Sequence, residues 1–412
     1  MKKIKILLII FIILFNISLP TFADDEEIEI ENIDVGEIIQ TSTDATNMPV
    51  INSRAAVIYD RTSGAVIYGK NEDTVKKMAS TTKIMTAVIV LENGNLSDVV
   101  EVSKKAAGTG GSRLGLTAGA KITVNDLLYG LMLCSGNDAA VALAQHIGGS
   151  VQGFAELMNK KVEELGLKNT HFVTPHGLDE EEHYTTAYEL AKITDYALNI
   201  DKFAEIVRTK NYTVTINGYS KTLGNTNELL GNLNGVYGVK TGFTNGANRC
   251  LVTAIKRDNL DIICVVLGAD TKKNRTQDSI KLIEYAFKNY QLIDLNGIIE
   301  KEFVNWKLEN MHAVEIIKGK KQYANLIIDI HDVSYYPVNK NDIDKIAVTI
   351  ETEKTINAPV NENQVLGKLT LKIGEKEVKQ IDIICENDIN KKTYVDYFMG
   401  LISNYTKYLE SL

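Results

Sequence analysis

The sequence predicts a mixed α/β (α+β) chain, with helices and antiparallel strands in its larger N-terminal part, then a small β-rich domain and a terminal amphipathic helix. Within residues 56–68, two short apolar runs flank a polar turn, which is typical of a β-hairpin. Residues 84–91 are mostly apolar, which is typical of a helix that is buried on most of its circumference. Apolar and polar residues alternate in 346–350 and 369–373, as in half-buried strands.

The N-terminus carries an export signal. Lysines near Met1 precede the almost wholly apolar residues 6–19, and small residues around Ala23 complete a secretory signal peptide at 1–23. We therefore expect an exported protein that acts at the outer face of the cytoplasmic membrane or in the cell wall space. Residues 24–50 are rich in acidic side chains, so we expect a solvated leader without regular structure there.

Charge and cysteine content exclude several classes of protein. Loss of residues 1–23 removes three lysines and no acidic residue, which changes the net charge from −8 to −11 and makes nucleic acid an unsuitable partner. Four scattered cysteines do not form a disulfide framework in 412 residues, so we expect mostly buried thiols. No His/Cys cluster has zinc-ligand spacing, and the sequence requires no metal and no cofactor.

The elements between the hairpin and the β-rich domain follow from local patterns. Thr123 is placed to cap a helix with apolar residues at helical spacing. Further helices are expected at 139–165 and 187–198, and strands at 251–255 and 262–267, joined by a turn at 257–259.

The first chemical motif is Ser80-Thr81-Thr82-Lys83 at the start of the apolar helix. A serine hydroxyl is a weak nucleophile unless a nearby base takes its proton. Residues three apart share a helix face, so the amine of Lys83 can reach Ser80. A helix N-terminus also favours a developing oxyanion. The alternative is a helix cap followed by a surface lysine.

The second motif, Ser135-Gly136-Asn137, places a hydroxyl and a carboxamide in a turn between two helical runs. An ordinary helix-connecting turn is the alternative, since Ser, Gly and Asn are common turn residues. His176 lies in a further tight turn, where a loop-ordering role is favoured over a catalytic one.

The third motif, Lys240-Thr241-Gly242, lies in residues 238–244, where an edge strand is expected to begin. A lysine, a hydroxyl and a glycine in succession supply a cationic donor, a neutral donor and close backbone access for a substrate. The alternative is an edge strand that lysine protects from aggregation.

Together the three motifs, separated by 55 and 105 residues, match in order and approximate spacing those of penicillin-recognising serine enzymes. Over roughly residues 50–390 the chain resembles the D-alanyl-D-alanine carboxypeptidases, the low-molecular-weight penicillin-binding proteins. The resemblance implies a β-lactamase/penicillin-binding-protein-like catalytic domain at 51–290, with an antiparallel sheet flanked by helices, and a β-rich domain at 291–388. It also implies removal of terminal D-alanine from peptidoglycan stem peptides and covalent inhibition by β-lactam antibiotics.

The resemblance also implies a role for each motif residue. Ser80 is the expected nucleophile and Lys83 its base, which burial beside a second ammonium would hold partly neutral. The other implied roles are a proton relay (Ser135), an amide that holds Lys83 and substrate (Asn137), carboxylate binding (Lys240, Thr241 and, as an assistant, Arg275), close backbone approach (Gly242) and an oxyanion hole from the N–H groups of Ser80 and Phe243.

Two features qualify the match. Cys134 stands where the family often has proline, and we expect it to be packed. Residues 160–190 contain no Glu-x-x-x-Asn, the loop signature of class A β-lactamases, so penicillin should acylate Ser80 and leave slowly. A DD-endopeptidase, or a penicillin-binding sensor or wall-binding module without turnover, remains an alternative function.

The C-terminal residues 389–412 form a predicted amphipathic helix whose aromatic and aliphatic side chains share one stripe. Aromatic residues suit the headgroup layer, so a membrane-surface anchor is one interpretation. Packing on the β-rich domain or on another chain is the other. Charges interrupt the segment, which therefore cannot span a bilayer.

Overall fold

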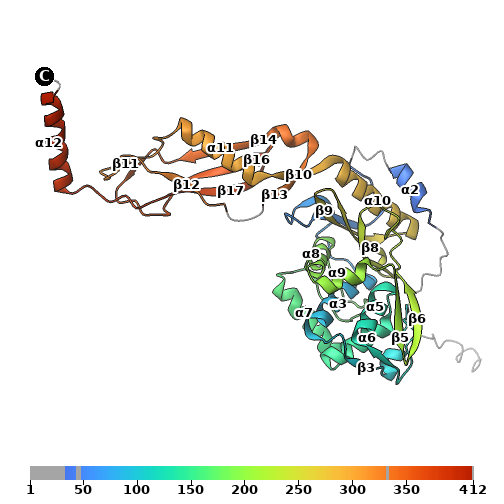
Figure 1. Cartoon of the computed structure of the whole chain (residues 1–412). Helices are drawn as coiled ribbons and strands as arrows, with labels where there is room; N and C mark the ends of the chain where they lie inside the picture. Colours follow the sequence, from blue (N-terminus) through green and yellow to red (C-terminus); the bar gives the residue numbers. More distant parts are fainter. Residues whose placement is uncertain (1–32, 43–47, 331–333, 411–412) are drawn as a thin grey trace, which may run out of the picture. The chain divides into compact units, whose positions relative to one another are not determined.

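The computed structural model describes residues 33–42, 48–330 and 334–410, so the predicted signal peptide lies outside the described residues. The chain divides into two compact units, one ending at Lys288 and the other beginning at Asn289 (Figure 1). Each unit is built around its own sheet and its own hydrophobic core.

A five-stranded antiparallel sheet forms the centre of the first unit, in the order β2-β1-β9-β8-β7. Its strands are β1 (Ala55–Asp60), β2 (Val66–Lys70), β7 (Val236–Thr244), β8 (Asn248–Arg257) and β9 (Leu260–Ala269). The predicted hairpin is therefore confirmed as β1 and β2. The predicted pair of strands is confirmed as β8 and β9, both longer than expected. β7 is an edge strand that begins before the third motif, at Val236.

Helices cover this sheet and form the rest of the unit. They are the single 3-10 turn η1 (Ala79–Thr82), α3 (Lys83–Asn93), α4 (Lys104–Ala107), α5 (Val124–Leu133), α6 (Asn137–Gly148), α7 (Val151–Glu164), α8 (Ala187–Leu198), α9 (Asp201–Arg208) and α10 (Lys272–Asn289). Two small antiparallel two-stranded sheets complete it: β3 (Val99–Glu101) with β4 (Lys121–Thr123), and β5 (Asn211–Ile216) with β6 (Tyr219–Gly224).

Both faces of the sheet are buried. Alternate residues of β9, among them Ile263 and Val265, join the core formed with α3, α5, α6 and α8, and α3 is central to that core. Their neighbours Ile262 and Cys264 point to the opposite face and are also fully buried. Figure 1 shows α10 on that opposite side of the sheet. Because helices flank an antiparallel sheet, the predicted mixed α/β fold is confirmed.

Two local predictions are wrong. Residues 24–50 were expected to lack regular structure, but α2 (Val35–Ser42) is a helix in which Val35 and Ile38 are buried and Asp34 accepts a hydrogen bond from the Glu37 N–H. The long helix expected at 139–165 is two helices, α6 and α7. Gly149 separates them with φ 69°, a conformation that favours glycine, and Ser150 then caps α7.

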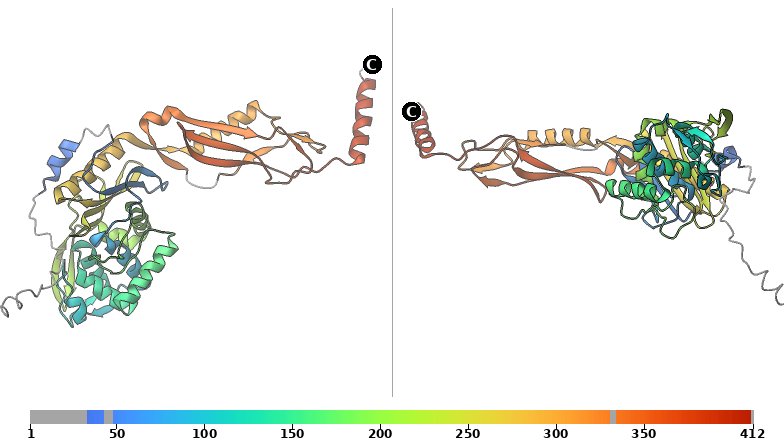
Figure 2. Two further views of the ribbon diagram at one scale, coloured as in Figure 1. Left: turned by 180° about the vertical axis from the view of Figure 1, so that it is seen from behind. Right: turned by 90° about the horizontal axis from the view of Figure 1, so that it is seen from below.

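The second unit contains a four-stranded antiparallel sheet in the order β12-β17-β16-β14. Its strands are β12 (Leu326–Ile328), β14 (Ile346–Thr352), β16 (Val365–Ile373) and β17 (Lys376–Cys385), and the smaller elements are β10 (Tyr290–Asp294), β11 (Glu315–Ile317), β13 (Tyr335–Asn339), the 3-10 helix η2 (Lys340–Lys345) and β15 (Thr355–Asn357). Sequence alternation thus predicted β14 and β16 correctly, but missed α11 (Leu295–Glu309). Figures 1 and 2 show α11 lying along this sheet, and Leu295, Ile299 and Phe303 join its core.

The last described element is α12 (Tyr394–Glu410). None of its residues is buried, and Thr393 caps its start through reciprocal hydrogen bonds with Asp396. The predicted helix is therefore present, but its apolar side chains do not pack against the described part of the chain. No helix within the described ranges is both long and apolar enough to cross a membrane.

Candidate active site

Ser80 lies in η1, the single 3-10 turn that leads directly into α3, rather than in the first turn of the helix itself. Two threonines fix this turn: Thr81 Oγ1 donates to Met78 O at 2.6 Å and Thr82 Oγ1 donates to Ala79 O at 2.8 Å. Ser80 is only 5% exposed, yet it lines a small cavity. The hydroxyl is thus held in a preformed position.

Lys83 is the first residue of α3 and is fully buried. Its Nζ lies 2.7 Å from Ser80 Oγ, 2.7 Å from Asn137 Oδ1 and 2.9 Å from the carbonyl oxygen of His176. The predicted contact of serine and lysine is therefore present, and the alternative of a surface lysine does not hold for this residue.

The turn between α5 and α6 carries the second motif. Ser135 adopts a positive φ of 60° and lines the same cavity as Ser80. Asn137 begins α6, where its Nδ2 donates to Gly110 O at 2.9 Å and its backbone N–H donates to Ser112 O at 2.7 Å. One carboxamide thus joins Lys83 to the loop at 110–116.

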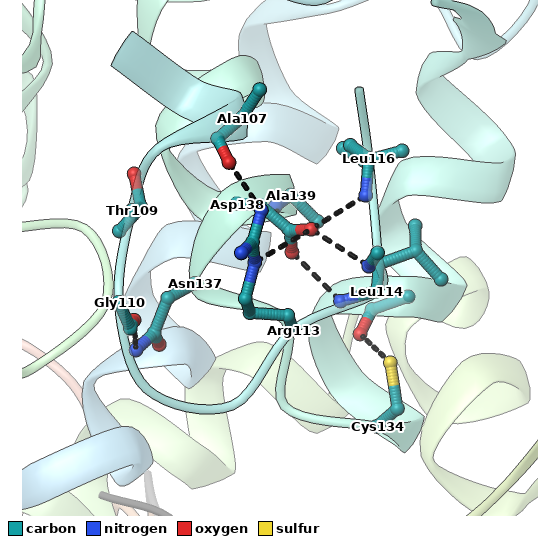
Figure 3. A network of polar contacts seen from close by, with 12 residues as sticks. Ala107, Thr109, Gly110, Arg113, Leu114, Leu116, Cys134, Asn137, Asp138 and Ala139 are labelled. Atoms are coloured by element: carbon teal, nitrogen blue, oxygen red, sulfur yellow. Dashed lines mark hydrogen bonds and ion pairs between the residues drawn. The ribbon is translucent and has the colours of Figure 1, made fainter. Parts of the chain in front are cut away.

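Asp138, which the sequence analysis did not single out, holds that loop in place (Figure 3). Its carboxylate is fully buried and accepts hydrogen bonds from the backbone N–H groups of Leu114, Gly115 and Leu116 at 2.8, 2.8 and 2.9 Å. Such charge-assisted bonds are the stronger kind. The sequence feature that could have indicated this role is the position of an acidic residue directly after Asn137.

The third motif lies along the edge strand β7. A Cβ at Gly242 would lie 3.0 Å from the backbone nitrogen of Ser80, a tighter contact than side chains usually make, so glycine allows β7 to approach η1 without displacing it. Lys240 is buried and donates to Thr241 O, while Thr241 Oγ1 lies 2.8 Å from Thr226 Oγ1. Phe243 stacks under the Arg249 guanidinium, 4.3 Å from its ring centre.

One cavity of about 60 Å³ brings most of the predicted residues together. Its lining residues are Ser80, Ser112, Ser135, Thr226, Thr241, Gly242, Phe243 and Arg275. Lys83, Asn137 and Lys240 do not line it, but Lys83 contacts the lining residue Ser80, and Asn137 contacts Lys83. Arg275, 35 residues after Lys240, reaches it from α10, although its guanidinium is only 1% exposed. Hydroxyl groups and one cation therefore dominate the site.

His176 and Cys134 order the loops around the site. His176 Nδ1 accepts the Leu178 N–H at 3.2 Å, and burial, reinforced by the charge of Lys83, lowers the pKa of His176 to about 3. The neutral ring orders its turn and its carbonyl anchors Lys83. Cys134 Sγ donates to Gly130 O, and burial raises the pKa of this thiol. The expectation of a packed Cys134 is confirmed.

The loop at 174–178 also contacts the nucleophile turn directly. A Cβ at Gly177, where φ is 90°, would lie 1.9 Å from Ala79 O, so this position requires glycine. His183, another residue that the sequence analysis missed, accepts the Val173 N–H at Nδ1, so its Nε2 carries the proton and donates to Thr82 Oγ1 at 2.8 Å. Both contacts are long-range, which is why sequence spacing did not reveal them.

Comparisons with known proteins agree with this geometry. The family model of D-alanyl-D-alanine carboxypeptidases matches residues 41–271, and that of the C-terminal domain of penicillin-binding protein 5 matches residues 307–391. The chain is 33% identical to D-alanyl-D-alanine carboxypeptidase DacF of Bacillus subtilis, over 86% of this chain and 90% of that protein.

Solved structures give the same result. The D-alanyl-D-alanine carboxypeptidase DacD of Francisella tularensis superposes with a TM-score of 0.70 at 27% identity, over 84% of this chain and 96% of that one. Penicillin-binding protein 5 of Haemophilus influenzae gives a TM-score of 0.67 at 28% identity, over 84% of this chain and all of that one. The resemblance inferred from three short motifs is thereby confirmed, and the chain belongs to the D-alanyl-D-alanine carboxypeptidase family.

Proposed function

We propose that the protein is a serine D-alanyl-D-alanine carboxypeptidase that removes the terminal D-alanine from peptidoglycan stem pentapeptides and so limits their cross-linking. The observation that carries the proposal is the 2.7 Å contact between Ser80 Oγ and Lys83 Nζ, because it joins a nucleophile to a buried base beside a cavity. Family membership supports the substrate class.

In the proposed mechanism, neutral Lys83 takes the proton from Ser80 as Oγ attacks the carbonyl carbon between the two D-alanines. The negative oxygen that forms would accept hydrogen bonds from the backbone N–H groups of Ser80 and Phe243. The close approach of Gly242 to the Ser80 nitrogen supports this pairing. Collapse breaks the peptide bond, and the leaving amine receives the proton through Ser135.

The resulting acyl-enzyme is an ester on Ser80. A water molecule gives a proton to Lys83 and attacks the ester carbonyl, and the shortened peptide leaves as the proton returns to Ser80 Oγ. Asn137 would keep Lys83 aligned through both steps, since it accepts from Lys83 and is itself tied to Gly110. A β-lactam would follow the first half of this sequence and acylate Ser80.

The terminal carboxylate of the substrate would bind Lys240, Thr241 and Arg275. Thr241 and Arg275 line the cavity with Ser80, and Lys240 precedes Thr241 on the edge strand. A guanidinium, an ammonium and a hydroxyl are suitable donors for a carboxylate. This arrangement predicts a preference for substrates whose terminal carboxyl group is free.

The two units would divide the work between them. We assign catalysis to residues 51–290 and a stalk or partner-binding role to residues 291–388, in which no described residue has a comparable nucleophile and base. Residues 389–412 would bind the membrane surface through α12, whose exposed apolar side chains include Phe398 (62% exposed), Leu401 (69%) and Tyr405 (64%). The catalytic unit would then act outside the cytoplasm, near the membrane or the wall.

The test combines intact mass after mixing with benzylpenicillin and D-alanine release from diacetyl-lysyl-D-alanyl-D-alanine. The proposal expects a stable adduct on Ser80, release of D-alanine, and loss of both in Ser80→Ala with an unchanged fold. An adduct without release from this peptide would favour an endopeptidase or a sensor, and cross-linked dimers as substrate would separate those two. Absence of an adduct on the wild type would refute the proposed function.

A further inference from the structure

The segment between β6 and β7 contacts two of the side chains assigned above to the substrate carboxylate. Thr226 Oγ1 lies 2.8 Å from Thr241 Oγ1, and Glu228 Oε1 accepts a hydrogen bond from Arg275 Nη2 at 2.5 Å. Thr226 and Arg275 both line the cavity that contains Ser80. One short segment therefore supports both donors.

The contact of Glu228 with Arg275 is an ion pair in a largely dry environment. The side chain of Glu228 is 16% exposed and that of Arg275 is 1% exposed. Burial alone would raise the pKa of Glu228, but the Arg275 charge and hydrogen bonds from Thr276 and Arg275 outweigh burial and hold this pKa below its usual value. Glu228 is therefore a carboxylate at neutral pH.

Stability alone does not account well for this pair. Oε1 accepts from both Arg275 and Thr276, whereas no donor among the described residues reaches the buried Oε2. A buried acceptor without a partner costs free energy, and buried ion pairs contribute little net stability. Such local costs are expected where a residue serves a site.

A second pair in the same unit shows the contrast. Arg257 of β8 donates to both oxygens of Glu284 of α10, at 2.7 and 3.0 Å, and the two side chains are 19% and 21% exposed. Neither residue lines the cavity around Ser80. This bidentate pair satisfies the whole carboxylate and joins two elements, as a purely structural pair should.

We propose that Glu228 is a positioning residue that aims the guanidinium of Arg275 at the cavity and thereby sets the preference of the site for ligands with a free carboxylate. The inference rests on the proposed function. An arginine side chain has several rotatable bonds, and a carboxylate that holds one edge of the guanidinium removes much of that freedom before the ligand arrives.

The test measures acylation by benzylpenicillin and by its methyl ester, which lacks the carboxylate. The ratio of the two second-order rate constants isolates carboxylate recognition, because both ligands acylate Ser80. Loss of one charge-assisted contact corresponds to about a 10-fold change. We expect Glu228→Ala to lower the ratio about 10-fold or more, mainly by slowing benzylpenicillin.

Two conservative variants separate the effect of side-chain length from the effect of charge. They test the proposal even if Glu228→Ala does not fold. Glu228→Gln keeps an oxygen at the same reach, so its ratio should stay within about 3-fold of the wild type, whereas Glu228→Asp keeps the charge but retracts it and should lower the ratio about 10-fold. Glu284→Ala is the matched control and should leave the ratio unchanged.

An unchanged ratio in Glu228→Asp, or a larger loss in Glu228→Gln than in Glu228→Asp, would overturn the positioning role. Equal slowing of both ligands would do the same, since it would mean general damage to the site. These outcomes are distinct from failure of the proposed function. In that case benzylpenicillin would not acylate the wild type at all, and the inference would fall with it.

Discussion

Lys83 Nζ lies 2.7 Å from Ser80 Oγ and is held there by two further acceptors, Asn137 Oδ1 and the carbonyl oxygen of His176. Three acceptors match the three N–H donors of an ammonium group. When Lys83 is neutral, the two outer contacts can keep its remaining hydrogens, and the contact with Ser80 reverses so that the hydroxyl donates to the amine. Proton transfer therefore requires no side-chain movement.

Replacing Lys83 by methionine removes the base but keeps an unbranched apolar chain of similar length. We expect acylation by benzylpenicillin to slow about 10³-fold, in the range typical for loss of a general base. The second-order rate constant of adduct formation measures this. Lys160→Met, at a lysine whose side chain is 72% exposed, is the control and should acylate like the wild type. Near-normal acylation of Lys83→Met would exclude Lys83 as the base.

Lys240→Ala should weaken recognition of the terminal carboxylate. Removal of one ammonium from a carboxylate site costs about 2 kcal/mol, so kcat/KM for the free-acid peptide should fall about 30-fold. The C-terminally amidated peptide should be a poor substrate for the wild type and should lose much less in the variant. If the wild type cleaved acid and amide equally well, the assignment of Lys240 would be wrong.

Asp138→Asn should loosen the loop at 110–116. An asparagine offers one acceptor oxygen, whereas the two oxygens of Asp138 receive three backbone N–H groups from this loop and that of Ala139, so at least one buried donor loses its partner. We expect the free energy of unfolding to fall by about 3 kcal/mol. Acylation should slow as well, because Asn137 is bound to the same loop. Urea denaturation measures the first effect, and Asp73→Asn, at an exposed position, is the control.

The sequence predicted those parts of the site that depend on short spacing. Ser80 with Lys83, the cap at Thr123 and the start of α8 after Thr186 are local features, and the structure contains all three. The order and spacing of the three motifs then indicated a resemblance to a family, and this resemblance implied that the motifs form one site. Local patterns alone do not show that the motifs lie close together. Residue roles at these motifs stay predictions until the variants are measured.

The parts that sequence reasoning missed depend on contacts between distant segments. Glu228 and Arg275 are 47 residues apart, and His183 and Thr82 are 101 apart, so no periodicity connects them. Gly177 is required only because Ala79 lies against it. α11 was not predicted because the alternation of apolar and polar residues later in the domain indicated strands for the whole domain. Leu295, Ile299 and Phe303 nevertheless have helical spacing.

Two histidines with lowered pKa values should make the catalytic unit sensitive to acid. Burial lowers the pKa of His183, and likewise that of His176, from 6.5 to about 3. Between these values the unfolded chain binds protons that the folded chain does not. Their contribution to stability is therefore complete above about pH 6.5 and is lost as the pH falls toward 3, by about 1.4 kcal/mol per pH unit for each histidine.

His183→Asn tests this sign. Its amide oxygen can replace Nδ1 as the acceptor for Val173, but the side chain does not titrate. The variant should be less stable than the wild type at pH 7, and its unfolding free energy should fall less steeply between pH 6.5 and 4.5, by about 1.4 kcal/mol per pH unit. Urea midpoints at several pH values measure the two slopes. Parallel curves would show that His183 is not buried in its neutral form.

Deleting residues 391–412 should release the mature protein from membranes without lowering its activity on soluble peptides. The reason is that no residue of α12 is buried, so its removal exposes no core, while its apolar side chains are available to the headgroup layer. Sedimentation with lipid vesicles measures binding, and D-alanine release measures activity. Because the polar face is only weakly basic, binding should depend little on salt.

A milder variant, Phe398→Ser with Leu401→Ser, should also detach the protein, whereas Asn404→Ser on the polar face should not. Retention of the deletion variant on vesicles would place the anchor elsewhere in the chain.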